Sequence, residues 1–387
     1  MDITVHSPRI IEIGGGAVSR VTGLLARLGL SRPLIVTDPV MVAIGLIGRL
    51  TEPLDQAGIR HEIFSKTVPE PVDTVVETGA ARMRGGDFDC LIGFGGGSPI
   101  DTAKAMTILA ARGGAMRECK VPFAADAAAL PLIAIPTTAG TGSEVTRFTV
   151  ITDTERDEKM LIAGLGALPL AAIVDYELTL SVPRRTTADT GIDAFTHALE
   201  AFVSRRANPV SDGYARAAMR LIGTHLRAVY AEPENRAARE GMMLGATLAG
   251  LAFSNASVAL VHGMSRPIGA HFHVPHGLSN AMLLPAVTRY SLNAALPRYA
   301  EAARLAGFAA PEDTDQLAGA KLLENLAALN REMDVPTPEA FGIGMAEWQA
   351  RKTVMAGQAL ASGSPGNNPR VPEADAIIAL YDEIYTG

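Results

Sequence analysis

The sequence predicts a protein of two parts: a doubly wound, parallel-sheet α/β nucleotide-binding domain over residues 1–183 and an all-helical domain over residues 184–387. In the first part, short runs rich in β-branched residues alternate with helix-like segments, a pattern typical of a parallel sheet covered by helices. From Pro183 onward the chain is alanine-rich, with helical spacing and almost no strand signal. A chain of 387 residues can bury two such cores.

The first part contains six short apolar runs that we expect to be strands. They are residues 9–13, 33–37, 61–64, 90–94, 132–135 and 172–175. The fourth run leads into a glycine-rich stretch, residues 93–98, which precedes a helix expected to begin at Ser98–Pro99. Glycines let backbone N–H groups approach a phosphate, and the helix N-terminus adds positive potential. Ser98 replaces the last glycine of the usual dinucleotide fingerprint, so a glycine-rich turn without a ligand is the alternative.

Asp38 follows the second expected strand. Its carboxylate can accept hydrogen bonds from both ribose hydroxyls of adenosine and would repel a 2′-phosphate. The sequence therefore favours NAD over NADP. The alternative is a turn aspartate that contacts no ligand.

The second part carries an acid and a histidine four residues apart, Asp193 and His197. On a helix this spacing places both side chains on one face, where they can share one ion. His262 and His276 complete a set of one carboxylate and three imidazoles, which suits a divalent transition metal. A single histidine is more often structural, but the set predicts a metal site.

His262 and His276 can meet at one ion only if the chain reverses between them. On one continuous helix they would be roughly 20 Å apart along the axis, whereas metal ligands lie about 2 Å from the ion. Pro267, Gly269 and Pro275 are expected to break the helix, and residues 275–277 are expected to present His276 from a tight turn.

Charge and cysteine content exclude several classes of protein. Lys and Arg number 34 against 41 Asp and Glu, with no basic block, so nucleic acid is not an expected partner. Cys90 and Cys119 have no metal or disulfide spacing and are interpreted as reduced thiols.

The first residues lack the features of a signal peptide, so we expect a cytoplasmic location. Residues 241–265 carry no charge, but their Gly, Ser and Asn content favours a buried interior helix over a membrane span.

Three stretches resemble the iron-containing (group III) alcohol dehydrogenase family over essentially the whole chain. They are residues 95–104 (GGGSPIDTAK), residues 135–146 (IPTTAGTGSEVT), and residues 262–277, which begin with His-Gly-Met and end with Pro-His-Gly. The resemblance implies a dehydroquinate synthase-like architecture, NAD as the cofactor and Fe²⁺ as the metal. From the donor set alone, Zn²⁺ or another divalent metal is also possible. The implied activity is hydride transfer between NAD(H) and a small primary alcohol or its aldehyde.

The resemblance also implies residue roles. The implied metal ligands are Asp193, His197, His262 and His276. The implied cofactor residues are Asp38, Gly95, Gly96, Gly97, Ser98, Asp101, Thr137, Thr138, Ser143, Thr146, Phe148 and Lys159. On residue type alone, Lys159 would be a solvated surface lysine.

One position departs from the family pattern. Many members place a histidine four residues after the ligand at 262, and Arg266 stands there. An arginine cannot act as a base at neutral pH, so the proton would leave through water, a ribose hydroxyl, His271 or His273. Alternatively, Arg266 holds an anionic substrate, or it packs against an acid or the cofactor.

The sequence favours this function over three others. A metal- and NAD-dependent lyase of the dehydroquinate synthase type would require more basic residues near the proposed ligands. A metal-free maleylacetate reductase-like enzyme would not need the four metal ligands. A non-catalytic binding protein would not need to keep all four ligands. A homodimer or higher homo-oligomer is expected, with no membrane partner.

Overall fold

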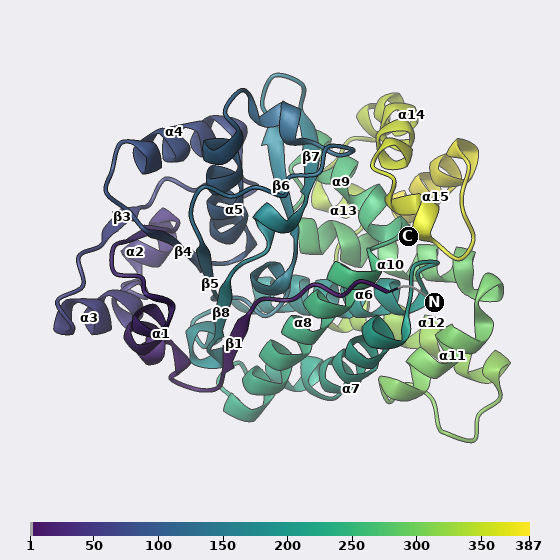
Figure 1. Ribbon diagram of the computed structural model, residues 1–387. Helices are drawn as coiled ribbons and strands as arrows, with labels where there is room; N and C mark the ends of the chain where they lie inside the picture. Colours follow the sequence, from purple (N-terminus) through teal and green to yellow (C-terminus); the bar gives the residue numbers. More distant parts are fainter. Residues whose placement is uncertain (1–2) are drawn as a thin grey trace. The chain divides into compact units, whose positions relative to one another are not determined.

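The computed structural model describes residues 3–387, which form two compact units. Residues 6–182 make an α/β unit, and residues 183–387, together with residues 3–5, make a helical unit. In Figure 1 the α/β unit runs from purple to teal, and the helical unit continues from green to yellow.

Six parallel strands form one sheet in the described part of the α/β unit, in the order β1-β8-β5-β4-β2-β3. They are β1 (Ile10–Ile13), β2 (Pro33–Val36), β3 (Glu62–Phe64), β4 (Cys90–Gly95), β5 (Leu132–Pro136) and β8 (Ala171–Val174). All six predicted strands are confirmed, and the predicted fold class with them. Because the strands are parallel, their carboxyl ends share one edge of the sheet.

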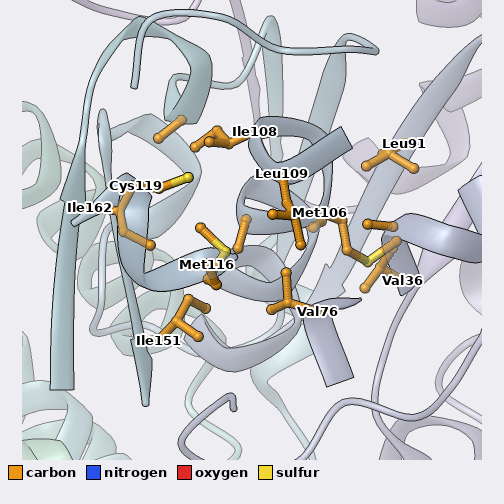
Figure 2. Close-up of a cluster of buried hydrophobic side chains, with 14 of the residues drawn as sticks. Val36, Val76, Leu91, Met106, Ile108, Leu109, Met116, Cys119, Ile151 and Ile162 are labelled. Atoms are coloured by element: carbon orange, nitrogen blue, oxygen red, sulfur yellow. The ribbon is translucent and has the colours of Figure 1, made fainter. Parts of the chain in front are cut away.

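Side chains of the sheet alternate between two buried faces. Leu34, Val36 and Leu91 pack with α4 (Asp73–Arg84) and α5 (Gly97–Arg112), as Figure 2 shows for part of this cluster. The residues that alternate with these along the strands point to the opposite face of the sheet. That face, which includes Ile35, Ile92 and Phe94, packs against α1 (Val21–Leu28) and α3 (Gly48–Gln56). Both faces are therefore covered, which explains why the strand sequences are continuously apolar.

The sequence did not predict two further strands of this unit. β6 (Phe148–Asp153) and β7 (Glu158–Ala163) form an antiparallel pair outside the main sheet. The remaining elements are α2 (Pro39–Ala43), η1 (Ala17–Arg20), η2 (Met116–Cys119), η3 (Ser143–Val145), η4 (Leu165–Ala167) and η5 (Tyr176–Thr179).

The helical unit has no strand among its described residues, as predicted. Its elements are α6 (Arg184–Val203), α7 (Pro209–Ala231), α8 (Arg236–Ala256), α9 (Leu260–Phe272), α10 (His276–Ser291), η6 (Leu292–Ala294), α11 (Leu296–Leu305), α12 (Asp315–Glu332), α13 (Pro338–Phe341), α14 (Met345–Ala361), η7 (Ser364–Asn367) and α15 (Ala374–Thr386). Local signals set several boundaries. Asn208 and Ser211, for example, form a capping box at the start of α7, with a proline at its first position.

The uncharged stretch 241–265 is buried, but the prediction of one helix there was wrong. It belongs to α8 and α9, which are bent by 103° relative to each other. The chain breaks at Ser257, which has a φ of 64°, a conformation that a helix cannot continue. Among residues 3–387, no single helix is both long and apolar enough to cross a membrane, and only the bent pair α8 and α9 reaches that apolar length together.

Candidate active site

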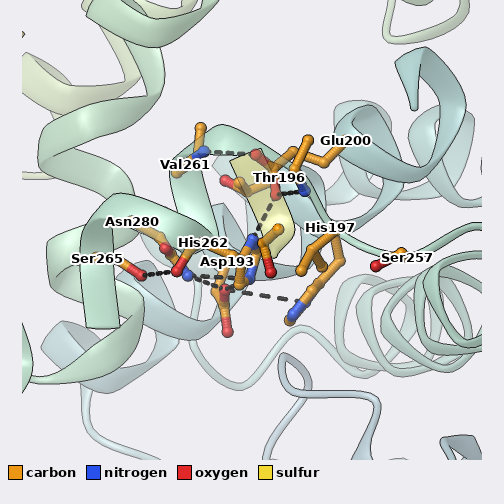
Figure 3. Close-up of polar contacts among 12 residues, drawn as sticks. Asp193, Thr196, His197, Glu200, Ser257, Val261, His262, Ser265 and Asn280 are labelled. Carbon is orange, nitrogen blue, oxygen red and sulfur yellow. Dashed lines mark hydrogen bonds and ion pairs between the residues drawn. The ribbon is translucent and has the colours of Figure 1, made fainter. Parts of the chain in front are cut away.

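Helix α6 carries three functional candidates on one face. Asp193, His197 and Glu200 lie at positions i, i+4 and i+7, and their side chains gather in the centre of Figure 3. All three are buried, with Asp193 only 1% exposed. A carboxylate buried to this degree needs a counter-charge or several hydrogen-bond donors.

The other two predicted ligands come from consecutive helices. His262 lies in the first turn of α9, and His276 is the first residue of α10. The chain reverses at His273, which has a φ of 55° and ends α9, and Pro275 precedes α10. Pro267 and Gly269 lie inside α9 and do not end it, so two of the predicted breaking points were wrong. His276 is presented by a helix start rather than by a tight turn.

The approach of α10 to α6 depends on Gly277. A Cβ atom at Gly277 would lie 2.5 Å from the backbone oxygen of Asp189, one turn before Asp193 on α6. No real Cβ tolerates that distance, so any larger residue would push the two helices apart. The glycine in the Pro-His-Gly motif therefore brings His276 within reach of Asp193.

The four predicted ligands, called here the ligand set, converge on one point. Each offers one ligand atom, and these four atoms all lie within 4.8 Å of one another. The Asp193 Oδ1 atom is 3.4 Å from His262 Nε2, 3.8 Å from His197 Nδ1 and 4.0 Å from His276 Nε2. One carboxylate oxygen and three imidazole nitrogens at these separations fit a single divalent transition metal ion.

Asn280 supports this fit independently. Its amide NH₂ donates to Asp193 Oδ1 at 2.7 Å and lies 3.1 Å from His262 Nε2 and 3.2 Å from His276 Nε2, while its carbonyl oxygen is buried with no hydrogen-bond partner among residues 3–387. Three acceptor atoms thus face one weakly positive group. A cation satisfies such a cluster better than an amide does.

The charges around Asp193 favour its ionised form. Burial raises its pKa, but the positive charges of His197 and His276 outweigh burial, so the pKa of Asp193 lies below its usual range. For His262, burial lowers the pKa, whereas the charges of the nearby Glu200 and Asp193 carboxylates and their contacts with the ring raise it, with a net rise. The site therefore attracts positive charge.

The sequence analysis missed Glu200 and Asn280. Glu200 accepts the backbone N–H groups of Ala259 at 2.9 Å and Val261 at 2.6 Å, and its Oε2 lies 2.7 Å from His262 Nδ1. The available signals were spacings: Glu200 follows Asp193 by seven residues, and Asn280 follows His276 by four. Both intervals lie on the ligand face of a helix.

Two rings stack on His197, one member of the ligand set. The His197 ring stacks on Phe253 of α8, with ring centroids 4.2 Å apart, and on His262, with centroids 4.4 Å apart. These contacts hold the His197 ring by packing and exclude water on that side.

Arg266 lies one turn after His262 in the same helix and is 8% exposed. Its Nη1 donates to the Ser364 hydroxyl of η7 at 2.9 Å, and no described carboxylate pairs with it within 4.0 Å. Burial lowers the pKa of Arg266 to about 10, although the charge of Glu200 opposes this, so the side chain is still cationic at neutral pH. Gly263 lets η7 approach, because a Cβ atom there would lie 2.7 Å from Pro365.

In the α/β unit, the predicted glycine loop lies at the carboxyl end of β4. Gly95 has a φ of 147°, and a Cβ atom there would lie 2.5 Å from Pro99 and 3.4 Å from Asp38 Oδ2. The N-cap of α5 is Gly96, which has no capping side chain, so the first N–H groups of the helix are left for another acceptor. Asp38 also caps α2 by accepting the Met41 N–H at 3.0 Å, which leaves Oδ2 toward the loop.

The remaining predicted cofactor residues divide into two groups. Thr137 and Thr138 follow β5, next to the loop: Thr137 N–H donates to Gly95 O at 2.8 Å, and Thr138 lies 3.5 Å from a Cβ atom built on Gly96. Asp101, Ser143, Thr146 and Phe148 instead meet around a buried lysine that the sequence analysis did not single out.

That lysine, Lys104, donates to Thr146 O at 2.9 Å, Thr146 Oγ1 at 3.1 Å and Phe148 O at 2.8 Å. Asp101 accepts the Ser143 hydroxyl at 2.6 Å and the Val150 N–H at 2.9 Å. Burial lowers the pKa of Lys104 to about 8, against the opposing charges of Asp101 and Glu144. These side chains therefore brace α5 against β6.

Lys159 is not the solvated surface lysine that its residue type suggests. Its side chain is 4% exposed, and its Nζ lies 2.5 Å from Glu70. Glu70 itself has a φ of 56°, an uncommon backbone conformation for a non-glycine residue.

Two family models match the chain. "Iron-containing alcohol dehydrogenase" covers residues 8–176, and "Fe-containing alcohol dehydrogenase family, C-terminal" covers residues 187–385. A long-chain-alcohol dehydrogenase of Geobacillus thermodenitrificans is 38% identical over 387 residues, which is 98% of this chain and 96% of the relative.

Solved structures give the same picture. A crystal structure of 1,3-propanediol oxidoreductase superposes with a TM-score of 0.93 at 34% identity, and covers 100% of both chains. A sulfoacetaldehyde reductase from Bifidobacterium kashiwanohense, solved in complex with NAD⁺, superposes with a TM-score of 0.87 at 29% identity, and covers 100% of this chain and 99% of that one.

Proposed function

We propose a function for this chain from one established premise: it belongs to the iron-containing alcohol dehydrogenase family. It is therefore an oxidoreductase that acts on alcohols or aldehydes. We infer that it transfers hydride between NAD(H) and a small primary alcohol or its aldehyde, with a divalent metal ion, Fe²⁺ by family, held by the ligand set. The convergence of four ligand atoms within 4.8 Å carries this inference.

A divalent metal ion in this site would lower the pKa of an alcohol hydroxyl and polarise an aldehyde carbonyl. The protein supplies the rest of the chemistry. Asp193 provides negative charge at the centre of the set, and the Phe253 ring, stacked on His197, forms an apolar wall. In such surroundings a charged group interacts more strongly than it does in water.

The α/β unit is proposed to bind NAD(H) at the carboxyl edge of its sheet. The backbone N–H groups at Gly96, Gly97 and Ser98 suit the pyrophosphate. Asp38 Oδ2 lies beside this loop and would accept from the adenosine ribose, which supports NAD over NADP. The Lys104 network would hold Ser143 and Thr146 in place rather than present their hydroxyls to the cofactor.

Arg266 supports a finer proposal, that the substrate is anionic. Its guanidinium is buried and has a hydroxyl as its one hydrogen-bond partner among the described residues. Asp193 and Glu200 would balance a divalent ion, so the charge of Arg266 would be left over, and a carboxylate or sulfonate could neutralise it. The NAD⁺-bound relative is named for an anionic aldehyde, sulfoacetaldehyde. The competing role for Arg266 is to anchor η7 on α9.

The rival functions are less favoured. The family models name alcohol dehydrogenases rather than a dehydroquinate synthase-type lyase. A maleylacetate reductase-like enzyme would not require four convergent ligands. The homodimer or higher homo-oligomer and the cytoplasmic location stay predictions.

The test is a substrate panel. Metal-free protein would be loaded anaerobically with Fe²⁺ or Zn²⁺, and NADH oxidation followed with neutral, carboxylated and sulfonated short aldehydes. Turnover that depends on added metal and falls after chelation is expected. Turnover unaffected by complete chelation would overturn the metal-dependent mechanism, and a preference for NADPH would overturn the cofactor assignment.

A further inference from the structure

Glu200 stands at the junction between helix α6 and the start of helix α9. It is 4% exposed and belongs to neither the ligand set nor the predicted cofactor residues. Its Oε1 accepts the Val261 N–H, and its Oε2 accepts the Ala259 N–H and contacts His262 Nδ1. One buried side chain therefore meets three hydrogen-bond donors on three nearby residues.

Two of these bonds replace a helix cap. Helix α9 has Ala259 at its N-cap, and no side chain of its own caps it. The first N–H groups of a helix need an acceptor, and a negative charge there is stabilising. Glu200 supplies both from α6, so it fixes the position at which α9 begins and hence the position of His262.

The third bond fixes the protonation pattern of the His262 ring. A carboxylate can only accept a hydrogen bond, so Nδ1 of His262 must carry a hydrogen. On the other side of the ring, Nε2 lies 3.1 Å from the Asn280 NH₂, a group that can only donate, so this contact fits an Nε2 that carries a lone pair. The contacts with Glu200 and Asn280 are thus compatible with the same tautomer. In that tautomer the Nε2 lone pair faces the ligand set, where Asp193 Oδ1 lies 3.4 Å away, and is free to bind a metal ion.

We propose that Glu200 is a positioning residue of the metal site, which sets both the place and the tautomer of His262. This inference rests on the proposed function, because it assumes that the ligand set binds a metal ion. It predicts that Glu200 controls metal affinity without touching the ion. An acceptor bonded to the distal nitrogen of a ligating histidine typically contributes about 10- to 100-fold to metal affinity.

The chain offers a matched control in Asp175. This carboxylate is also fully buried, and it accepts the backbone N–H groups of Gly16, Val18 and Glu177 at 3.0 to 3.1 Å. It lies in the α/β unit, and its backbone partners Gly16, Val18 and Glu177 belong to the same unit. Asp175→Asn therefore removes one buried charge and disturbs a similar set of backbone bonds, but changes no ligand.

The experiment measures Co²⁺ affinity, by competition with a chelator, for wild type, Glu200→Gln, Glu200→Asp and Asp175→Asn. The visible absorption of bound Co²⁺ reports the coordination geometry. Thermal unfolding of each metal-free protein separates stability from affinity. In ¹⁵N-histidine-labelled, metal-free protein, the ring nitrogen shifts report the tautomer of His262, assigned by comparison with His262→Ala.

We expect Glu200→Gln to weaken Co²⁺ binding by about 10- to 100-fold and to lower the Nδ1–H population of His262. Asp175→Asn should lower the unfolding temperature while Co²⁺ affinity stays within about threefold of wild type. An affinity of Glu200→Gln within threefold of wild type, or equal losses in the two variants, would overturn the proposal. If Glu200→Gln does not fold, Glu200→Asp, which keeps the charge but shortens the reach to His262, is judged by the same criteria. Failure of wild type to bind Co²⁺ would instead refute the proposed function.

Discussion

The two buried polar networks of this chain differ in whether their hydrogen bonds are complete. Around Lys104, the three ammonium hydrogens meet three oxygen acceptors, and the Asp101 carboxylate accepts from Ser143 and Val150. Around Asp193, three acceptor atoms face the single amide NH₂ of Asn280. The first network is saturated by the protein itself, whereas the second has an excess of acceptors.

This difference indicates that the Lys104 network contributes to stability, whereas the Asp193 network contributes to function. A saturated network has no capacity for a ligand, so its main effect is to hold α5 against β6. A network with more acceptors than donors is stabilised when a cation binds to it, and a metal ion can take that place. Substitutions in the two networks are therefore expected to have different effects.

The largest effect is expected in the unsaturated network. His276→Ala should abolish bound metal and reduce turnover by about a thousandfold or more, roughly 4 kcal/mol, because the metal loses a ligand and its substrate-binding geometry. NAD affinity should stay near that of wild type, because the α/β unit carries the proposed nucleotide site. Metal content and activity after chelation and reloading are the measurements. Full activity in this variant would refute the ligand assignment.

The saturated network should respond through stability alone. Lys104→Met removes the donor to two backbone carbonyls, so it should lower the free energy of unfolding by about 2–4 kcal/mol. Denaturant unfolding of the metal-free variant measures this, and metal affinity of the folded variant should be unchanged. If metal affinity fell as steeply as stability, the two networks would not be independent.

A substitution of Arg266 tests whether an anionic substrate pairs with its guanidinium. Arg266→His should reduce kcat/KM for a carboxylated or sulfonated aldehyde by more than about 2 kcal/mol, and should leave neutral aldehydes unaffected or improved. Matched steady-state kinetics on paired substrates measure this. Equal losses on both types would assign Arg266 to structure, through Ser364 and η7. No loss on either would place it outside the substrate site.

The smallest effect is expected at the nucleotide edge, where most of the proposed contacts are made by backbone. Asp38→Gly should lower the preference for NADH over NADPH by at least roughly tenfold, about 1.4 kcal/mol, because it removes a negative charge beside the proposed ribose site. The ratio of the two kcat/KM values measures it. Because Asp38 also caps α2, Asp38→Asn, which keeps the capping oxygen, is the control for stability.

The sequence predicted the six sheet strands because continuous β-branched runs such as residues 33–37 are buried on both faces and admit little ambiguity. It missed β6 and β7, whose half-buried alternation is a weaker signal. It predicted the ligand set because the chemistry lies in residue types at readable spacings. The spacing of seven residues from Asp193 places Glu200 on the ligand face of α6, but its role depends on the start of a helix sixty residues later, which that spacing does not reveal.

Pro267 is a similarly misleading signal in the sequence. Pro267 was expected to break a helix that continues through it, whereas the real break is the left-handed backbone of His273. The role of Gly277 was invisible as well, since its neighbour across the helix pair, Asp189, is far away in sequence.

The contact between Gly277 and Asp189 has a consequence for altering this protein. The spacing of the ligand atoms depends on how closely the backbones of α6 and α10 approach each other. Exchanging the ligand side chains alone therefore leaves the distance between these backbones unchanged. A single added methyl, in Gly277→Ala, would widen the site while leaving all four ligands in the sequence. Inspection of the ligand residues alone would then still class such a protein as metal-binding, although its capacity to hold a small ion would have been lost.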